Sequence, residues 1–270
     1  MAVAPVGNFS LPIMKLVRTT AVPIIQQLHL EERLLRTSSD NWCVINEGTN
    51  TPTIVMGVSG KVSELIELES VLQDRVPIIR RFTGGGTVIV DKGTVFVTFI
   101  CNKDAIPGLQ LYPRPIMSWT GQLYAKALQD IGEFSLFEND YVFGNCKFGG
   151  NAQSITRNRW IHHTSFLWDY DAKNMQYLKL PSRAPKYRTS RDHVDFLCSM
   201  KDYLASRSEF IGRTIGSIQD HFSLMPVEFD AIIDPSAATY PHSSKLLTEE
   251  LEVAMTSVRD EPSSTSAAYV

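Results

Sequence analysis

The stretch RRFTGGGTVIVDKGTVFVTFI, residues 80–100, combines three consecutive glycines with two arginines and two runs of β-branched and aromatic residues. β-branched and aromatic residues favour strands, whereas glycine interrupts them. The run DKG at 91–93 is typical of a tight turn, because glycine tolerates the positive φ that such turns require. The stretch therefore predicts a strand, a glycine turn, a second strand, a hairpin turn at 91–93 and a third strand.

Helical patterns stand on both sides of the strand-rich middle of the chain. This order predicts an α+β fold, with a central mixed or antiparallel β-sheet flanked by helices in a single domain at 21–258. We expect residues 1–20 to form an irregular lead-in and residues 259–270 a disordered tail. Segments with helical spacing of apolar residues include 24–37, 63–75, 118–132, 194–207, 211–223 and 243–257.

The composition is that of an ordinary soluble globular protein. Of 270 residues, 43% are hydrophobic and 20% are charged. The formal net charge of −3 gives no indication of a nucleic-acid partner. No apolar run approaches the roughly 20 residues that a membrane-spanning helix requires. We therefore expect neither a nucleic-acid partner nor a membrane anchor.

Cysteine usage bears on the compartment. Cys43, Cys101, Cys146 and Cys198 lie far apart and form no CxxC pair. This spacing favours a reducing compartment over a disulfide framework or a zinc ribbon. The N-terminal segment lacks the Arg- and Ser-rich character of an organellar transit peptide. We expect a mitochondrial or cytoplasmic protein that is not secreted.

The glycine triplet at 84–86 has two interpretations. It is a flexible hairpin turn, or it is a bare piece of backbone whose peptide N–H groups form an anion-binding nest. Three glycines between strong strands favour close approach of a ligand to the backbone. Alternation along the preceding strand should place Arg80 and Arg81 on opposite faces, so that one guanidinium can face a phosphate or carboxylate.

A second cluster lies in ENDYVFGNCKFGGNAQS. Lys147 stands just before two glycines and is either a solvated hairpin charge or a cation held over a carbonyl and a phosphate during acyl transfer. Asn151 and Gln153 share one side of an extended chain and offer amide donors and acceptors. His162 and His163 follow in HHTSFL, but no third ligand stands at a compatible spacing, so we expect no metal site.

Taken in order, these clusters resemble one family. RRFTGGGTVIVDKG is similar to the RRxSGGGxVxxDxGN signature of lipoate–protein ligase A, ENDYVFGNCKFGGNAQ to its NDL…KxxGNAQ segment, and HHTSFL to its HHGTLL strand. LHLEERLL, at 28–35, also resembles the family's opening helix. The resemblance covers roughly residues 20–200 and points to the eukaryotic, plant-like branch of the biotin/lipoate protein ligase superfamily.

The resemblance implies a catalytic domain with a two-step reaction. ATP and lipoate (or octanoate) would give an acyl-adenylate such as lipoyl-AMP, and a lysine of a lipoyl domain would then take the acyl group. Mg²⁺ would accompany ATP, because this ion usually reaches a site through phosphates. The acceptors would be lipoyl domains of 2-oxoacid dehydrogenase E2 subunits or the glycine cleavage H protein.

The resemblance also implies roles for individual residues. Lys147 would be catalytic and contact both the lipoyl carbonyl and the α-phosphate. The residues expected to bind the nucleotide or acyl-adenylate are Arg81, Gly84, Gly85, Gly86, Thr87, Val88, Ile89 and Asn151, and further pocket candidates are Arg80, Asp91, Gln153 and His163.

The chain departs from the family pattern at several positions. Val90 stands where the family usually has histidine, and Thr94 where it usually has asparagine; Gly149 and Thr164 are also unusual. The segment after Ser199 is too short for the C-terminal accessory domain of larger bacterial ligases. A separate accessory subunit is therefore one expectation.

Two other functions remain open. An octanoyl- or lipoyl-transferase working through a thioester would need a low-pKa cysteine in the pocket, and Cys146 is the only candidate beside Lys147, although alternation should point it away. A catalytically inactive binder of lipoyl domains would bind without turnover. The basic loop with Arg183, Lys186, Arg188 and Arg191 is either a docking patch for an acidic lipoyl domain or a solvated loop.

Overall fold

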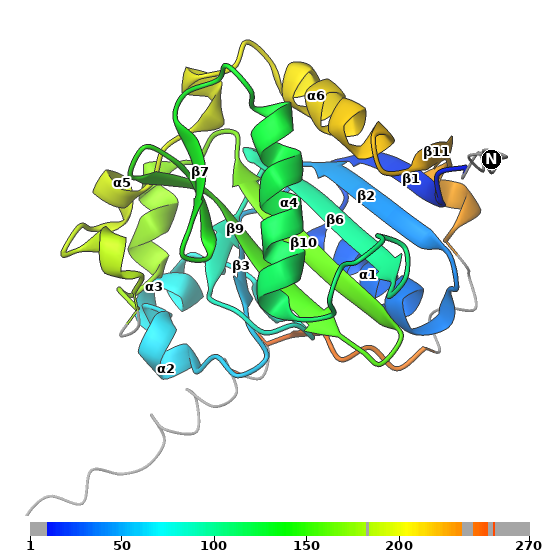
Figure 1. Ribbon diagram of the computed structural model, residues 1–270. Coiled ribbons are helices and arrows are strands. Elements are labelled where there is room, and N and C mark those ends of the chain that lie inside the picture. Colours follow the sequence, from blue (N-terminus) through cyan, green and yellow to red (C-terminus); the bar gives the residue numbers. More distant parts are fainter. Residues whose placement is uncertain (1–9, 182–183, 234–239, 248–250, 252–270) are drawn as a thin grey trace, which may run out of the picture.

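The computed structural model describes residues 10–181, 184–233, 240–247 and 251. A large mixed β-sheet forms its centre, and Figure 1 shows helices packed on both of its faces. Pairing is parallel at the end that carries the N-terminal strand and antiparallel elsewhere. The strand order is β11 (Ser223–Pro226), β1 (Ile13–Thr20), β2 (Asn41–Glu47), β6 (Thr94–Asn102), β10 (Arg159–Leu167), β9 (Cys146–Ile155), β8 (Asp140–Phe143) and β7 (Phe134–Phe137).

A second, four-stranded sheet carries the glycine triplet at one of its connections. β3 pairs with β4 in parallel and with β5 in antiparallel fashion, so β4 and β5 lie on opposite sides of β3. The segment that joins β4 to β5 must therefore pass over the end of β3. The order in this sheet is β12 (Lys245–Leu246), β4 (Ile78–Arg80), β3 (Thr53–Met56) and β5 (Val88–Val90).

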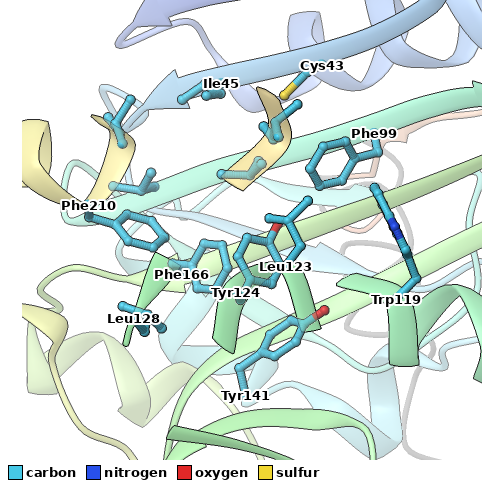
Figure 2. Close-up of a cluster of buried hydrophobic side chains, with 14 of the residues drawn as sticks. Cys43, Ile45, Phe99, Trp119, Leu123, Tyr124, Leu128, Tyr141, Phe166 and Phe210 are labelled. Atoms are coloured by element: carbon cyan, nitrogen blue, oxygen red, sulfur yellow. The ribbon is translucent and has the colours of Figure 1, made fainter. Parts of the chain in front are cut away.

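Helices cover the large sheet on both faces. The helices α4 (Pro113–Ala127) and α6 (Arg207–Gln219) pack on one face, and α1 (Ile24–Thr37) packs on the other. Figure 2 shows the core under α4, where Tyr124 meets Phe166 edge to face at a centroid distance of 4.9 Å. Such aromatic pairs add to the free energy gained by burying apolar area. The face under α1 is lined by aliphatic side chains, and the small sheet continues that layer.

The predicted α+β fold with a central mixed sheet is confirmed. The helix predicted at 24–37 is also confirmed at its full length, because Pro23 precedes it and an apolar stripe faces the sheet. One boundary was wrong, and one is untested. Residues 13–20 of the expected irregular lead-in form β1, which pairs with β2 along its length. The tail expected at 259–270 lies outside the described residues.

The hairpin predicted at 91–93 was wrong, although the local turn is present. Asp91 Oδ1 accepts the Gly93 N–H at 2.7 Å, and the Thr94 N–H donates to the Asp91 carbonyl. The strands on either side do not pair with each other, because β5 belongs to the small sheet and β6 to the large one. The turn therefore carries the chain from one sheet to the other.

Three predicted helices differ from the structure. The one at 63–75 is split into α2 (Val62–Leu65) and α3 (Leu68–Gln73), because Ile66 forms a β-bridge with Leu178 between them. The one at 194–207 is only α5 (His193–Phe196) and a short 3₁₀ turn at Met200–Asp202. Of the one at 243–257, residues 245–246 form β12 and residue 251 is helical, while 248–250 and 252–257 lie outside the described residues. Within the described ranges no helix is long and apolar enough to cross a membrane.

Candidate active site

A cavity of about 730 Å³ opens where the two sheets meet. Residues of α1, both sheets and the segment after β10 contribute to its wall. One part of the wall is apolar and consists of Ile24, Leu28, Val55, Val90 and Phe96. Another part is polar and includes the glycine triplet 84–86, Lys147, Asn151, Gln153, His163 and Arg188. A cavity with a long apolar wall and a few polar groups is typical of a small-molecule site.

The glycine triplet lies against a second glycine. A Cβ on Gly57, which directly follows β3, would stand 2.2 Å from the Gly85 carbonyl oxygen. Gly85 itself has φ +105°, and a Cβ there would stand 2.8 Å from Arg81 Nη2. Around Gly84 and Gly86, in contrast, a Cβ would meet nothing within 4 Å. The loop is therefore packed tightly on its inner side and open on the other.

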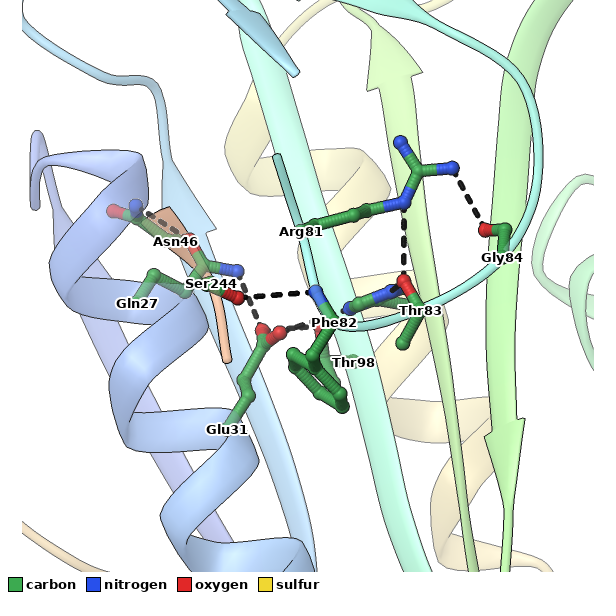
Figure 3. Close-up of polar contacts among 10 residues, drawn as sticks. Gln27, Glu31, Asn46, Arg81, Phe82, Thr83, Gly84, Thr98 and Ser244 are labelled. Carbon is green, nitrogen blue, oxygen red and sulfur yellow. Dashed lines mark hydrogen bonds and ion pairs between the residues drawn. The ribbon is translucent and has the colours of Figure 1, made fainter. Parts of the chain in front are cut away.

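The Arg81 guanidinium binds the carbonyl groups of this loop. Its Nη2 donates to the carbonyls of Gly84 and Gly86, both at 2.8 Å, and its Nη1 donates to the carbonyl of Val55 at 3.2 Å. Figure 3 shows the guanidinium turned toward the loop. In a trans peptide the N–H points opposite to the C=O. The N–H groups of Gly85 and Thr87 therefore point away from Arg81, and no hydrogen bond ties them to another described residue.

The charge of Arg81 is buried without an acidic partner among the described residues. Its side chain is only 5% exposed, and its contacts are three carbonyls and the Thr83 hydroxyl. Burial lowers the pKa of Arg81 to about 10, so the group stays protonated at neutral pH. A buried cation beside free N–H donors creates a positive potential that favours an anion.

A chain of hydrogen bonds joins Arg81 to helix α1 (Figure 3). Arg81 Nε donates to Thr83 Oγ1, which meets His163 Nε2 at 2.7 Å, and His163 Nδ1 lies 2.9 Å from Glu31 Oε2. Glu31 is fully buried and also accepts from Gln27 and Thr98. These contacts assign the Nδ1–H tautomer to His163. Its Nδ1–H then donates to Glu31, the Thr83 hydroxyl donates to Nε2, and every proton has an acceptor.

Lys147 reaches the cavity from β9. A bulge places Phe148 as the extra residue on this strand, opposite the step from Tyr141 to Val142. Lys147 Nζ pairs with Asp140 Oδ1 at 2.7 Å. Its side chain lies over residue 150, where a Cβ would contact Lys147 Nζ at 3.3 Å. The glycine at 150 therefore leaves room for the lysine.

Most of the predicted site residues lie on this one cavity. Asn151 also anchors the β7–β8 turn through its Nδ2, which donates to the Asn139 carbonyl at 2.8 Å. Gln153 leaves its buried Oε1 without a partner, as does Thr87 with its Oγ1. Unpaired buried acceptors on a cavity wall are natural contacts for a polar ligand. The predicted residues on the wall are Arg81, Gly84, Gly85, Gly86, Thr87, Val88, Ile89, Lys147, Asn151, Gln153 and His163.

Two further pocket candidates do not line the cavity. Arg80 points to the neighbouring loop, where its Nη1 hydrogen-bonds the carbonyls of Val58 and Gly60. Asp91 is used by the turn after β5, where its Oδ2 accepts from Asn174 Nδ2 at 3.1 Å. Both side chains therefore have structural contacts, which corrects the expectation that they belong to the pocket.

Glu31 and Gly57 were not among the predicted site residues. Glu31 shares a helix face with Leu28 and Leu35, and a carboxylate on an apolar stripe was the available signal. Gly57 carried no comparable signal, because its role depends on which loop packs against it. In the described parts of the chain, no group of three or more His, Cys, Asp or Glu side chains could hold a metal ion. All four cysteines are described, and none lines the cavity.

Comparison with known proteins identifies the class to which this fold and cavity belong, the catalytic domain of lipoate ligases. Residues 23–222 match the family of the lipoyl protein ligase A/B catalytic domain. The chain belongs to this family. The eukaryotic branch suggested by its motifs is not distinguished by the match.

Three similar proteins illustrate the family. "Inactive lipoate--protein ligase 2" of Plasmodium falciparum is 27% identical over 252 residues, which are 72% of this chain and 65% of that protein. The chain thus spans less than two thirds of that relative. The archaeal bi-partite lipoate protein ligase from Thermoplasma acidophilum, studied with its E2 lipoyl domain, has the same fold, with a TM-score of 0.68, 16% identity, and coverage of 89% and 92% of the two chains. A lipoate-protein ligase A bound with ATP gives a TM-score of 0.67 at 16% identity and covers 89% and 93%.

Proposed function

We propose that this chain is a lipoate–protein ligase that activates lipoate or octanoate with ATP and transfers the acyl group to a lysine of a lipoyl domain. One observation carries the proposal. The unpaired N–H groups of the glycine loop, the ammonium of Lys147 and an apolar wall all belong to one cavity. These are the groups that an acyl-adenylate needs: donors and a cation for the phosphate, and a dry surface for an aliphatic chain.

The first proposed step is adenylation. A carboxylate oxygen of the fatty acid attacks the α-phosphorus of ATP, the bond to the β-phosphate oxygen breaks, and pyrophosphate leaves. The Gly85 and Thr87 N–H groups would hold the α-phosphate, and Arg81 would keep them in place through the loop carbonyls. Mg²⁺, where bound, would enter with the phosphates of the nucleotide and offset their charge.

The second proposed step forms the amide. The deprotonated ε-amine of the acceptor lysine attacks the acyl carbon, the bond to AMP breaks, and the amine loses a proton to solvent or a base. Lys147 would contact the acyl carbonyl and the α-phosphate together, so that its charge stabilises the oxygen that becomes negative in the transition state. To do so its ammonium must leave Asp140, which it contacts at 2.7 Å.

The acyl chain would lie along the wall formed by α1, β3, β5 and β6. Ile24, Leu28, Val55 and Phe96 present aliphatic and aromatic surface there. Val90 is part of the same cluster. A histidine at this position would add a polar ring to the wall, so Val90 favours an apolar tail beside it.

The proposed partners are lipoyl domains of 2-oxoacid dehydrogenase E2 subunits or the glycine cleavage H protein. Support comes from the archaeal neighbour, which was studied with its E2 lipoyl domain. That neighbour is bi-partite, so we also propose that an accessory subunit takes part in activation. The mitochondrial or cytoplasmic location stays a prediction.

A second candidate is an inactive binder of lipoyl domains or acyl-adenylate. It is favoured by the similarity to a Plasmodium protein named as inactive. A thioester transferase has less support, because Cys146 and the other cysteines do not line the cavity. Cys146 Sγ instead donates to Asn145 Oδ1 at 3.4 Å.

The test is incubation of the purified chain with lipoate and an apo lipoyl domain, with and without ATP, followed by intact-mass measurement. ATP-dependent lipoylation supports the ligase. Modification only from an octanoyl-carrier protein, lost in Cys146→Ser, would establish the transferase. Binding of ATP and lipoate without modification, also after the accessory subunit of the archaeal type is added, would establish the binder.

A further inference from the structure

Arg188 is a buried guanidinium whose two terminal nitrogens have no hydrogen-bond partner among the described residues. The residue is 5% exposed and lies in the short 3₁₀ turn Lys186–Arg188 that precedes α5. Its Nε donates to the Arg191 carbonyl at 3.1 Å. Nη2 is shielded from solvent and unpaired, and Nη1 makes no hydrogen bond to any described residue. Arg188 is therefore too buried for a surface docking patch or a solvated loop, the two interpretations of the basic loop.

The side chain is held firmly in this position. The guanidinium carbon stands 4.7 Å above the centre of the Phe196 ring, a cation–π contact that fixes the plane of the fork. The neighbouring Tyr187 hydroxyl donates to Asp140 Oδ2 at 2.8 Å, which ties the turn to β8. Buried polar groups are almost always hydrogen-bonded, so a fixed fork without acceptors calls for an explanation.

The nearby carboxylates are already in use. Asp140 accepts from Tyr187 with one oxygen and pairs with Lys147 through the other. Asp192 caps α5 by accepting the Asp195 N–H at 2.8 Å. Neither forms an ion pair with Arg188 among the described residues. The guanidinium therefore has nearby negative charge but no acceptor of its own.

Arg188 lines the same cavity as Lys147, His193 and Phe196. Burial together with the positive charge of Arg188, and to a smaller extent that of Lys147, lowers the pKa of His193, so these groups lie within electrostatic reach of one another. The cavity wall thus carries two cations, Lys147 and Arg188, and the second of them presents a fork of N–H donors. An anion with several oxygens fits these groups best.

We propose that Arg188 is an anion-binding residue of the cavity, whose fork donates to phosphate oxygens of the nucleotide beside Lys147. The inference rests on the proposed function, because it takes ATP as the source of that phosphate. The same site would bind inorganic pyrophosphate, since only the phosphate oxygens are recognised by the fork. Arg188 is then a substrate-binding residue of the 3₁₀ turn Lys186–Arg188 rather than part of a surface patch.

The experiment compares Arg188→Met with Lys186→Met by isothermal titration of ATP, AMP, adenosine and inorganic pyrophosphate. Both variants remove one positive charge from the same turn, but Lys186 is exposed and does not line the cavity. We expect Arg188→Met to weaken ATP and pyrophosphate binding at least tenfold, the usual effect of losing a charged hydrogen bond. Adenosine binding should be unchanged, and Lys186→Met should resemble wild type for every ligand.

Arg188→Lys keeps the positive charge but lacks the forked N–H donors of the guanidinium. This variant replaces Arg188→Met in the experiment if the methionine variant fails to fold. We expect it to weaken pyrophosphate binding about threefold or more. Wild-type affinity for ATP and pyrophosphate in either folded variant would overturn the inference. So would a wild-type protein that binds neither ligand. If the wild-type protein lipoylates its acceptor and Arg188→Met binds ATP and pyrophosphate normally, only this inference is overturned. If pyrophosphate binding depends on Arg188 but no acyl-adenylate forms, only the proposed activity is overturned.

Discussion

Gly57→Ala tests whether the glycine loop is held in place by close backbone contact. A Cβ at this position would lie 2.2 Å from the Gly85 carbonyl oxygen, whereas real Cβ contacts start at about 3.0 Å. The carbonyl must therefore retreat by about 0.8 Å, and the clash is with backbone, which cannot rotate away as a side chain could. Overpacking of this kind costs about 1–3 kcal/mol of folding free energy.

The same displacement moves the donors that face the cavity. The Gly84 and Gly86 carbonyls would lose their 2.8 Å contacts with Arg81 Nη2, and the attached N–H groups would turn with them. A misplacement of about 1 Å costs about 100-fold in rate for groups that position a substrate. We expect kcat/KM for lipoyl-AMP formation to fall by about that factor and ATP binding to weaken.

Urea unfolding measures the first effect and pyrophosphate-release kinetics the second. Gly216→Ala is the matched control, because a Cβ on Gly216 in α6 meets nothing within 4 Å. Alanine there should leave activity unchanged and raise stability slightly. If Gly57→Ala unfolds at the same urea concentration as the control and binds ATP like wild type, the proposed tight contact under the loop is refuted.

Three further outcomes follow from the site and the core. Lys147→Met should abolish acyl-adenylate formation while the protein stays folded, because Asp140, although only 8% exposed, keeps its hydrogen bond from Tyr187; unchanged adenylation, measured by mass spectrometry, would remove the lysine from the mechanism. Glu31→Gln should cost about 2 kcal/mol in urea unfolding and raise the KM for ATP, because a buried amide cannot accept all three donors that Glu31 now satisfies. Stability should depend on pH through His162: burial, and to a smaller extent the neighbouring His163, lowers the pKa of His162 to about 3, so below pH 6.5 this side chain is protonated in the unfolded chain but not in the folded one. The free energy of unfolding should fall by up to about 1.4 kcal/mol per pH unit between pH 6.5 and 3 from this group, and His162→Gln should flatten that slope in urea titrations at several pH values; an identical slope in the variant would contradict the assignment.

Local sequence patterns predicted the elements that depend on local physics. Helix α1 was predictable because its apolar stripe and its start after Pro23 are both evident from a short stretch of sequence. The turn at 91–93 was also predictable as a turn. Its role as a hairpin was not, since pairing of β5 and β6 depends on distant partners that compete for the same strand edges. The break in the helix predicted at 63–75 also depends on a distant partner, because Ile66 forms a β-bridge with Leu178.

That several motif residues share one cavity was predictable from the sequence, whereas the hydrogen bonds among them were not. The glycine loop, Lys147 and Asn151 share one cavity, as their motif spacing indicated. Alternation along β4 correctly indicated that Arg80 and Arg81 face different surroundings. Alternation could not show that the Arg81 guanidinium donates to the loop carbonyls, because this contact depends on the backbone path between β4 and β5.

The charges on the cavity wall bear directly on the choice between a ligase and an inactive binder. Arg81 donates only to neutral acceptors, and the terminal nitrogens of Arg188 have no acceptor among the described residues. Both arginines can therefore bind an anion without breaking an ion pair seen among these residues. Lys147 differs, because it must exchange Asp140 for ligand oxygens before it can act on an acyl phosphate. Tyr187 holds Asp140 in place during such an exchange. A binder could therefore keep the loop and both arginines, so a test at Lys147 bears more directly on turnover than a test at either arginine.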